Sequence, residues 1–291
     1  MVFAAANASA QVKQYNYDLS PFSSIDVSNE FDVTAETGEV YSALVTVDEP
    51  LKEYVNVSVK GGVLFIKLDE KNIPSETKKM FKGKGAVVPT YKVHVVTPTF
   101  SALNLADKAK FSLVGQFVTN ENFVLTATDN ATVTSLIINA PSFTTNLEKK
   151  ANITANVTTT NLTVNANGSS NLNLTQEAKI AVYKLSGSAN VVSHGSVESL
   201  DLVSKGSAKA ILNGSANICN FTANGSYNIN ALNLANENTT VTLTGGGTLT
   251  TAATNALKVT LSGGANLIFN GNPQVEVGSI KSSSMTRYGA K

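Results

Sequence analysis

A short phrase built around a glycine pair recurs along the second half of this chain. It reads KLSGSANVV at 184–192, VSKGSAKAI at 203–211, TANGSYNIN at 222–230, TLTGGGTLT at 242–250 and TLSGGANLI at 260–268. With the residue after each pair as a reference point, the register extends back to Ala151, Ala131 and Ala109, at a spacing of about 19 residues. A fixed period of this length indicates a repeat architecture, in which each repeat packs only on its neighbours.

Three columns of the repeat are apolar or small, and the positions between them are polar. The column two residues after the reference point contains Phe111, Val133, Ile153, Leu172, Val191, Ala210, Ile229, Leu249 and Leu267. The columns six and four residues before it are of the same kind, whereas the column one residue after it holds only Lys, Thr and Asn. Because successive side chains of a strand point to opposite faces, this alternation predicts a short strand on each side of a glycine-containing bend.

Two short strands and a bend in about 19 residues fit a coil that returns to its start one rung higher. A hairpin would need no such period, and the signature of a leucine-rich repeat is missing. We therefore predict an all-β protein, a right-handed parallel β-helix whose like residues stack at the strand spacing of about 4.8 Å. Charged residues make up only 15% of the chain, which suits a β-structure whose outward positions are mostly Asn and Thr.

The predicted domain organisation has four parts. These are an N-terminal tail at 1–19, an N-terminal β region at 20–100, the regular rungs at 101–275 and a C-terminal tail at 276–291. The β region is expected to form the first rungs or a sheet that caps the solenoid, because an open end would template aggregation. It carries a long exposed insertion at 69–90, which is rich in lysine and contains Pro74 and Pro89.

The net charge of +1 argues against a nucleic-acid binder, which needs a basic face. No run of about 18 apolar residues is present, so no helix is expected to span a membrane. Ala8-Ser9-Ala10 before Gln11 resembles a signal-peptidase site, although the apolar segment upstream is short and lacks basic residues. We interpret residues 1–10 as the remnant of an export signal, and an ordinary disordered tail is the alternative.

The order of several short motifs resembles one bacterial family. FSSIDVSNEFDVTAETGE is followed by VKGGVLFIKL, then by YKVHVVTPTFSALNLADKAKF and by serial GSA rungs. This order, over roughly residues 20–275, resembles the putative autotransporter adhesin, head GIN domain family of Bacteroides-like bacteria. The resemblance implies a β-helical, exported protein with no established enzymatic activity, for which the adhesin role rests on an analogy of shape.

Candidates for catalysis are few. Glycoside hydrolysis needs two carboxylates about 5 to 10 Å apart, and from 151 to 236 the only acids are Glu177, Glu198 and Asp201. The alternation around Leu200 and Leu202 points Asp201 outward, so we interpret Asp201 and Glu198 as a solvated pair. No catalytic residue and no cofactor are therefore predicted, and the protein is expected not to be an enzyme.

Two places carry residue types that bind metal ions. Asp107 and Asp129 share the column two before the reference point and could hold a cation between adjacent rungs, but we favour turn residues at bends. His94 and His194 have no acid or cysteine at ligand or triad spacing, so no metal site is predicted. Cys219, the single cysteine, falls in an apolar column and is expected in the core.

The one concentration of charge is the lysine cluster of the insertion, which consists of Lys78, Lys79, Lys82 and Lys84. This cluster could contact anionic glycans or lipid headgroups, and a solvated loop is the alternative. The outward Asn and Thr columns could bind sugar, or could stabilise the stack through amide hydrogen bonds.

The leading functional hypothesis is an exported, non-catalytic adhesin or binding protein in the periplasm, at the outer-membrane surface or secreted. Its partner would be a glycan or a surface protein. One alternative is a carbohydrate-active enzyme or a sugar-binding module on a β-helix. A second alternative is a self-associating structural rod, which would be a homo-oligomer.

Overall fold

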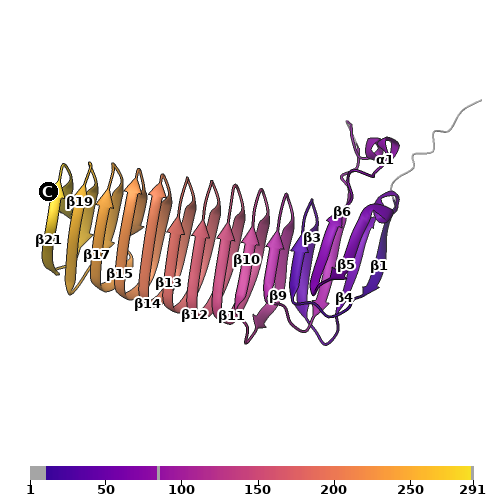
Figure 1. Ribbon diagram of the computed structural model, residues 1–291, viewed down its shortest axis with the longest axis horizontal. Coiled ribbons are helices and arrows are strands. Elements are labelled where there is room, and N and C mark those ends of the chain that lie inside the picture. The colour runs from indigo at the N-terminus through magenta and orange to yellow at the C-terminus, as the bar shows by residue number, and fades with distance from the viewer. Residues whose placement is uncertain (1–10, 84–85, 290–291) are drawn as a thin grey trace, which may run out of the picture.

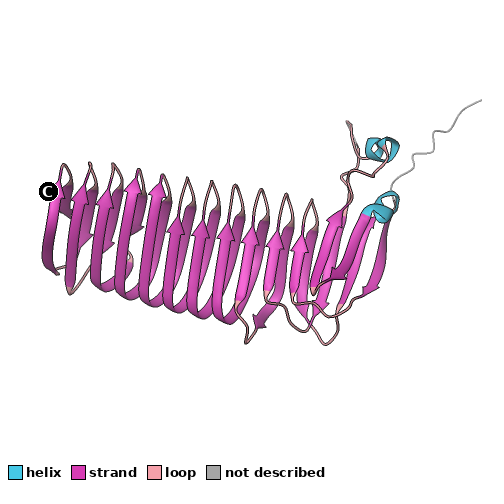
Figure 2. Ribbon diagram, in the orientation of Figure 1, coloured by secondary structure: helices cyan, strands magenta, loops and turns pink. Residues whose placement is uncertain are grey.

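The computed structural model describes residues 11–83 and 86–289, which form one continuous β-solenoid (Figure 1). It confirms the predicted fold class, because 67% of the structure is strand and 4% helix, in about 10 turns of about 19 residues. Figure 2 shows that the helices of the described chain, η1 (Glu49–Tyr54) and α1 (Ser75–Met80), both lie at the N-terminal end. Residues 1–10, to which the export signal was assigned, lie outside the described residues.

Each rung consists of two strand segments that stack in parallel on the same segments of the neighbouring rungs. In the middle of the solenoid one long strand supplies both segments. These strands are β11 (Thr132–Leu147), β12 (Asn152–Ala166), β13 (Asn171–Leu185), β14 (Asn190–Gly206) and β15 (Lys209–Gly225). The predicted column is observed, since Val191 pairs with Ala210 and Ala210 pairs with Ile229. Equivalent positions therefore lie directly above one another.

Toward the C-terminus each rung is made of two separate, shorter strands instead of one long strand. They are β16 (Asn228–Ala231), β17 (Leu234–Thr244), β18 (Thr248–Ala252), β19 (Ala256–Ser262) and β20 (Asn266–Asn270). The last rung consists of β21 (Gln274–Lys281) on β19 and β22 (Ser284–Arg287) on β20. The prediction of a C-terminal tail from residue 276 was therefore wrong. A register shift after Val259 and Val277 breaks the fixed period of the sequence at this rung.

At the N-terminal end the spatial order of the rungs differs from the chain order. The rung of β2 (Ser24–Val27) and β3 (Asp32–Thr37) stacks on that of β8 (Ala102–Leu105) and β9 (Lys110–Val118). Its other face is covered by an outer rung of β6 (Val63–Leu68) and β7 (Tyr91–Thr97). The regular course then continues from β8 and β9 to β10 (Phe123–Ala127) and β11.

Antiparallel strands close this end. β5 (Val55–Lys60) pairs with β6, β4 (Ser42–Asp48) pairs with β7, and β1 (Val12–Asp18) pairs with β4. The N-terminal β region therefore supplies both first rungs and a capping sheet. The prediction of a tail over 1–19 was wrong for β1. Tyr15 and Tyr17 alternate along this strand and pack against the core. The polar residues on either side of them made the strand difficult to recognise from the sequence.

The interior is a stack of apolar side chains, and it is aromatic near the N-terminal end. The rings of Phe123 and Phe143, on adjacent rungs, stack with centroids 5.7 Å apart, and Phe100 lies 4.7 Å from Phe117. One buried polar group in this interior is the Tyr183 hydroxyl, which is hydrogen-bonded to Gln176 and Ser193. Burial raises the pKa of the Tyr183 phenol, so the phenol stays neutral inside the stack.

Amide side chains form ladders on the outside. Asn165 Nδ2 donates to Asn146 Oδ1 on the rung before at 2.8 Å, and Asn255 Nδ2 donates to Asn238 Oδ1 at 2.9 Å. These contacts match the expectation that outward Asn columns stabilise the stack. Neither helix of the described ranges is long and apolar enough to cross a membrane.

Candidate functional site

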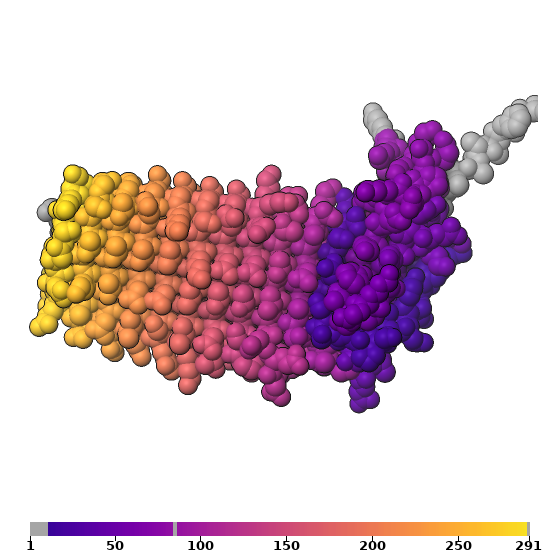
Figure 3. Space-filling model, in the orientation of Figure 1, coloured from indigo at the N-terminus to yellow at the C-terminus, as the bar shows by residue number. Residues whose placement is uncertain are grey.

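The insertion predicted at 69–90 interrupts the outer rung. It connects β6 to β7 and includes α1, and it projects from the edge of the solenoid that carries the glycine-containing corners (Figure 1). The lateral surface of the rungs shows regular rows of side chains, whereas the N-terminal end is raised and irregular (Figure 3). The insertion thus departs from the repeat at the N-terminal end of the solenoid.

A cleft of about 430 Å³ lies between the insertion and the end of the solenoid. Its apolar lining comes from both sides: Leu51, Leu68, Ile73, Phe81, Pro89 and Tyr91. Leu51 and Ile73 are buried, so this lining is part of the folded core and not a loose loop. Four charged side chains complete the cleft: Glu30, Glu70, Lys78 and Lys82. The combination offers an apolar surface with charged groups of both signs.

The structure places the four lysines of the predicted cluster in different surroundings. Lys78 and Lys82 line the cleft. Lys79 does not line it, and its Nζ lies 2.8 Å from Glu76 Oε1 in an exposed ion pair within the helix. Lys84 lies outside the described residues. Two of the four lysines therefore share a concave surface with apolar residues, and their role as a contact surface stays a prediction.

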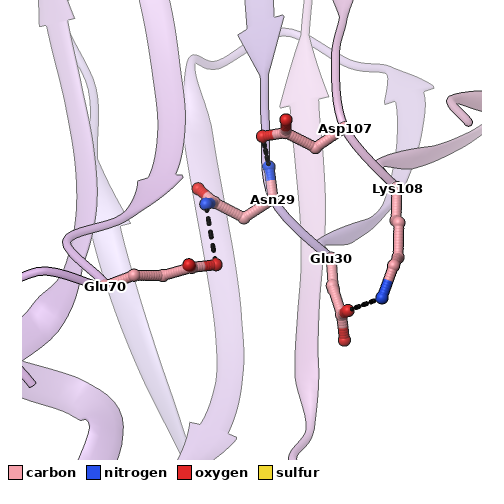
Figure 4. Close-up of polar contacts among 5 residues, drawn as sticks. All are labelled: Asn29, Glu30, Glu70, Asp107 and Lys108. Carbon is pink, nitrogen blue, oxygen red and sulfur yellow. Dashed lines mark hydrogen bonds and ion pairs between the residues drawn. The ribbon is translucent and has the colours of Figure 1, made fainter. Parts of the chain in front are cut away.

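Asn29 joins the insertion to the rungs (Figure 4). Its backbone N–H donates to Asp107 Oδ2 at 2.9 Å, and its Nδ2 donates to Glu70 Oε1 at 3.0 Å. Its Oδ1 accepts a hydrogen bond from the N–H of Leu68 at 2.8 Å. The φ of 64° at Asn29 is in the left-handed region that asparagine tolerates better than most residues. One corner residue thus positions the start of the insertion.

Glu30 is held by the next rung. Its Oε1 accepts from Lys108 Nζ, and this bond raises the pKa of the Lys108 ammonium (Figure 4). Burial raises the pKa of the nearby Tyr91 phenol to about 12, helped by the negative charges of Glu30, Glu70 and Asp48. The Tyr91 side chain, which lines the cleft, is therefore uncharged at physiological pH.

Comparison with known proteins places the chain. The family described as putative auto-transporter adhesin, head GIN domain, matches residues 21–191 and again residues 174–273. The chain belongs to this family. The matches cover the cap except β1, the insertion and the regular rungs, as the sequence resemblance implied. No curated protein matches the chain.

Solved structures share the fold over almost the whole length. A putative adhesin from Parabacteroides distasonis ATCC 8503 is 18% identical, with a TM-score of 0.55 over 96% of this chain and 97% of that chain. A putative adhesin from Parabacteroides merdae ATCC 43184 is 21% identical, with a TM-score of 0.50 over 95% of this chain and 96% of that chain. At these identities the likeness shows the fold of this family member.

The other candidate ligands of this head GIN domain protein have structural roles. Asp107 and Asp129 adopt left-handed φ values of 58° and 63°, as expected for turn residues. Asp107 accepts the N–H of Asn29, and the carboxylate of Asp129 accepts from Lys149 Nζ, which lowers the pKa of Asp129. Both carboxylates are thus engaged within the corners.

The histidines and the cysteine lie away from the cleft. His94 Nε2 lies 3.0 Å from Glu36 Oε1, a carboxylate on the neighbouring strand that spacing along the chain did not reveal. His194 is exposed, and its Nδ1 lies 3.4 Å from Asn213 Nδ2 on the next rung. Cys219 is fully buried, and burial, with a smaller contribution from Asp201, raises its pKa to about 12. A neutral buried thiol is the core residue that the apolar column predicted.

Sequence reasoning missed the acidic residues of the cleft. Glu30 lies in a corner of the second rung, and Glu70 lies 40 residues later at the start of the insertion. A signal for Glu30 was present, because Phe31 occupies the reference position of its own rung, as Ala109 does in the next, and Glu30 and Lys108 each stand one residue before it. Their ion pair follows once the two rungs are known to be neighbours.

Proposed function

We propose that this chain is an exported, non-catalytic adhesion protein that binds an anionic glycan in the cleft beside the insertion. The observation that carries the proposal is the meeting of Lys78 and Lys82 with an apolar surface in one cavity of about 430 Å³. Family membership supports an adhesin role at the cell surface, in the periplasm or after secretion. The solenoid would then act as a rigid stalk that presents this end.

Glycan chemistry fits the lining. The non-polar face of a sugar ring packs on apolar and aromatic surfaces such as those of Phe81 and Tyr91. A carboxylate or sulfate on the same sugar would lie near the ammonium groups of Lys78 and Lys82. Glu30 and Glu70, which line the same cleft, would accept hydrogen bonds from sugar hydroxyls through the carboxylate oxygens that Lys108 and Asn29 leave free.

A binding screen on acidic and neutral glycans and on matrix proteins tests this proposal. Lys78→Glu with Lys82→Glu is expected to weaken binding of acidic glycans at least about tenfold, which corresponds to about 1.4 kcal/mol. The matched control is Lys205→Glu with Lys209→Glu, an equal charge change at exposed positions of a distant corner, which should leave binding unchanged. Equal losses in both variants, or binding that ignores the acidic groups, would contradict the proposal.

A second candidate function is carbohydrate cleavage, since Glu30 and Glu70 line the same cleft. Two carboxylates in one cleft are the minimum for glycoside hydrolysis. Against this role, Lys108 and Asn29 already engage the two carboxylates. Incubation of the protein with the glycans it binds decides between the two functions. Turnover that Glu30→Gln and Glu70→Gln each abolish would establish the enzyme, and binding without turnover would support the adhesin.

A further inference from the structure

The last rung of the solenoid is an open sheet edge. β21 pairs with β19, β22 pairs with β20, and no other strand of the described ranges pairs with either of them. Seven of the eight residues of β21 are exposed. An unpaired edge of this length presents a row of backbone donors and acceptors that another strand can complete.

Three apolar side chains, whose partners on the preceding rung are buried, are uncovered here. Val275, Val277 and Ile280 stack on Leu257, Val259 and Leu261, all three of which are fully buried. In the last rung, however, Val275 is 41%, Val277 50% and Ile280 40% exposed. Within residues 11–83 and 86–289, the core of the solenoid is thus open at this end, in contrast to the N-terminal end, where antiparallel strands cover it.

We propose that this end is the interface of a tail-to-tail homodimer, in which β21 pairs antiparallel with β21 of a second copy. A two-fold axis between Gly278 and Ser279 would set Glu276 opposite Lys281 of the second copy. The same register sets Val277 opposite Ile280, and the symmetry makes each contact occur twice. Opposite charges and apolar side chains therefore match in one register.

The backbone conformation of β21 allows the charged pair and the apolar pair to form in the same register. The ladder between β19 and β21 shifts after Val277, so that Ile280, and not Ser279, stacks on Leu261. Val277 and Ile280 therefore both face the core columns, although they lie three positions apart, which in a regular strand would put them on opposite faces. Directly opposite residues of an antiparallel pair lie on the same face, which joins the two open cores into one.

Charge complementarity also favours a second copy of this chain as the partner that binds this edge. Lys281 is exposed, and Glu276 Oε1 lies 2.9 Å from Lys258 Nζ of its own chain, in an exposed ion pair. Lys281 of the second copy would add a second cation to the same carboxylate. The interface is small, so a reversible dimer with a dissociation constant on the order of micromolar is expected.

Sedimentation velocity of the full chain over a wide concentration range tests the dimer. The wild-type protein is expected to shift from monomer to dimer as concentration rises. Lys281→Glu, which faces Glu276 with a like charge at two symmetric contacts, should weaken dimerisation at least about tenfold. The double variant Glu276→Lys with Lys281→Glu restores opposite charges and should return the dissociation constant to near the wild-type value.

Two further variants distinguish dimerisation through this edge from non-specific association of exposed apolar residues. Ile280→Lys should abolish the dimer, whereas Ile211→Lys, at a lateral position that is 43% exposed, should leave it intact. Thermal unfolding of each variant checks that it is folded. A monomer at all concentrations would overturn the proposal. Failure of the double variant to restore the dimer, or equal effects of Ile280→Lys and Ile211→Lys, would overturn it as well.

Discussion

Replacement of Gly214 by alanine is expected to lower the free energy of unfolding by on the order of 4 kcal/mol or more. A loss of this size is exceptional for a single substitution and indicates a severe steric conflict. Gly214 has a φ of 120°, which residues with a side chain rarely adopt. A Cβ at this position would lie 1.8 Å from the carbonyl oxygen of Gly195, the residue below it. That oxygen belongs to the ladder between β14 and β15, so it cannot move away without breaking their pairing.

Chemical denaturation followed by far-ultraviolet circular dichroism measures this effect as a lower midpoint. Gly246→Ala is the matched control, because a Cβ at Gly246 meets no atom within 4 Å. The control should change stability by less than about 0.5 kcal/mol. If Gly214→Ala and Gly246→Ala behaved alike, the close stacking of Gly214 on Gly195 would be wrong.

Deletion of half a rung is expected to abolish cooperative folding. Removal of residues 152–161 deletes the first strand segment of the β12 rung and the bend that follows it. Ala151 would then be joined to Leu162. Residues 162–170 then have no preceding segment on which to complete a turn, and the stacked columns on both sides lose their register. Because a slip in register moves apolar side chains to solvent, the cost is that of opening the core.

Deletion of the whole rung 152–170 is the matched control. It joins Ala151 to Asn171, which occupies the position of Asn152 one rung later. Every column is preserved, and the solenoid becomes one rung shorter. Thermal unfolding should remain cooperative with a midpoint within a few degrees of the wild type. Loss of folding in both deletions, or in neither, would contradict stacking of interchangeable rungs.

The regular part of the fold was predictable because its contacts repeat locally. Each column position has its neighbours about 19 residues away, so the sequence period alone places Val191 below Ala210. The N-terminal end lacks this property. Its chain leaves after β3, forms β4 to β7, and returns at β8, so β3 and β9 are neighbours although 78 residues separate their paired positions Asp32 and Lys110.

The candidate site was only half predictable for the same reason. The lysines of the insertion stand together in the sequence, and charge alone marks them. The remaining charged groups reach the cleft through the order of rungs, because Glu30 belongs to the inner rung and Glu70 begins the insertion of the outer one. The apolar residue Leu51 comes from η1 in the cap. No periodicity links these segments, so their meeting follows only from the folded structure.

Distances between spin labels along one outward column test the central claim, the vertical stacking of equivalent positions. Cysteines at Thr132 and at Lys209, Asn228 or Thr248, with the buried Cys219 replaced by alanine, would be four, five or six rungs apart. Double electron–electron resonance should give backbone separations of about 19, 24 and 29 Å, a constant step of about 4.8 Å per rung. Distances that fail to grow in equal steps would contradict the solenoid.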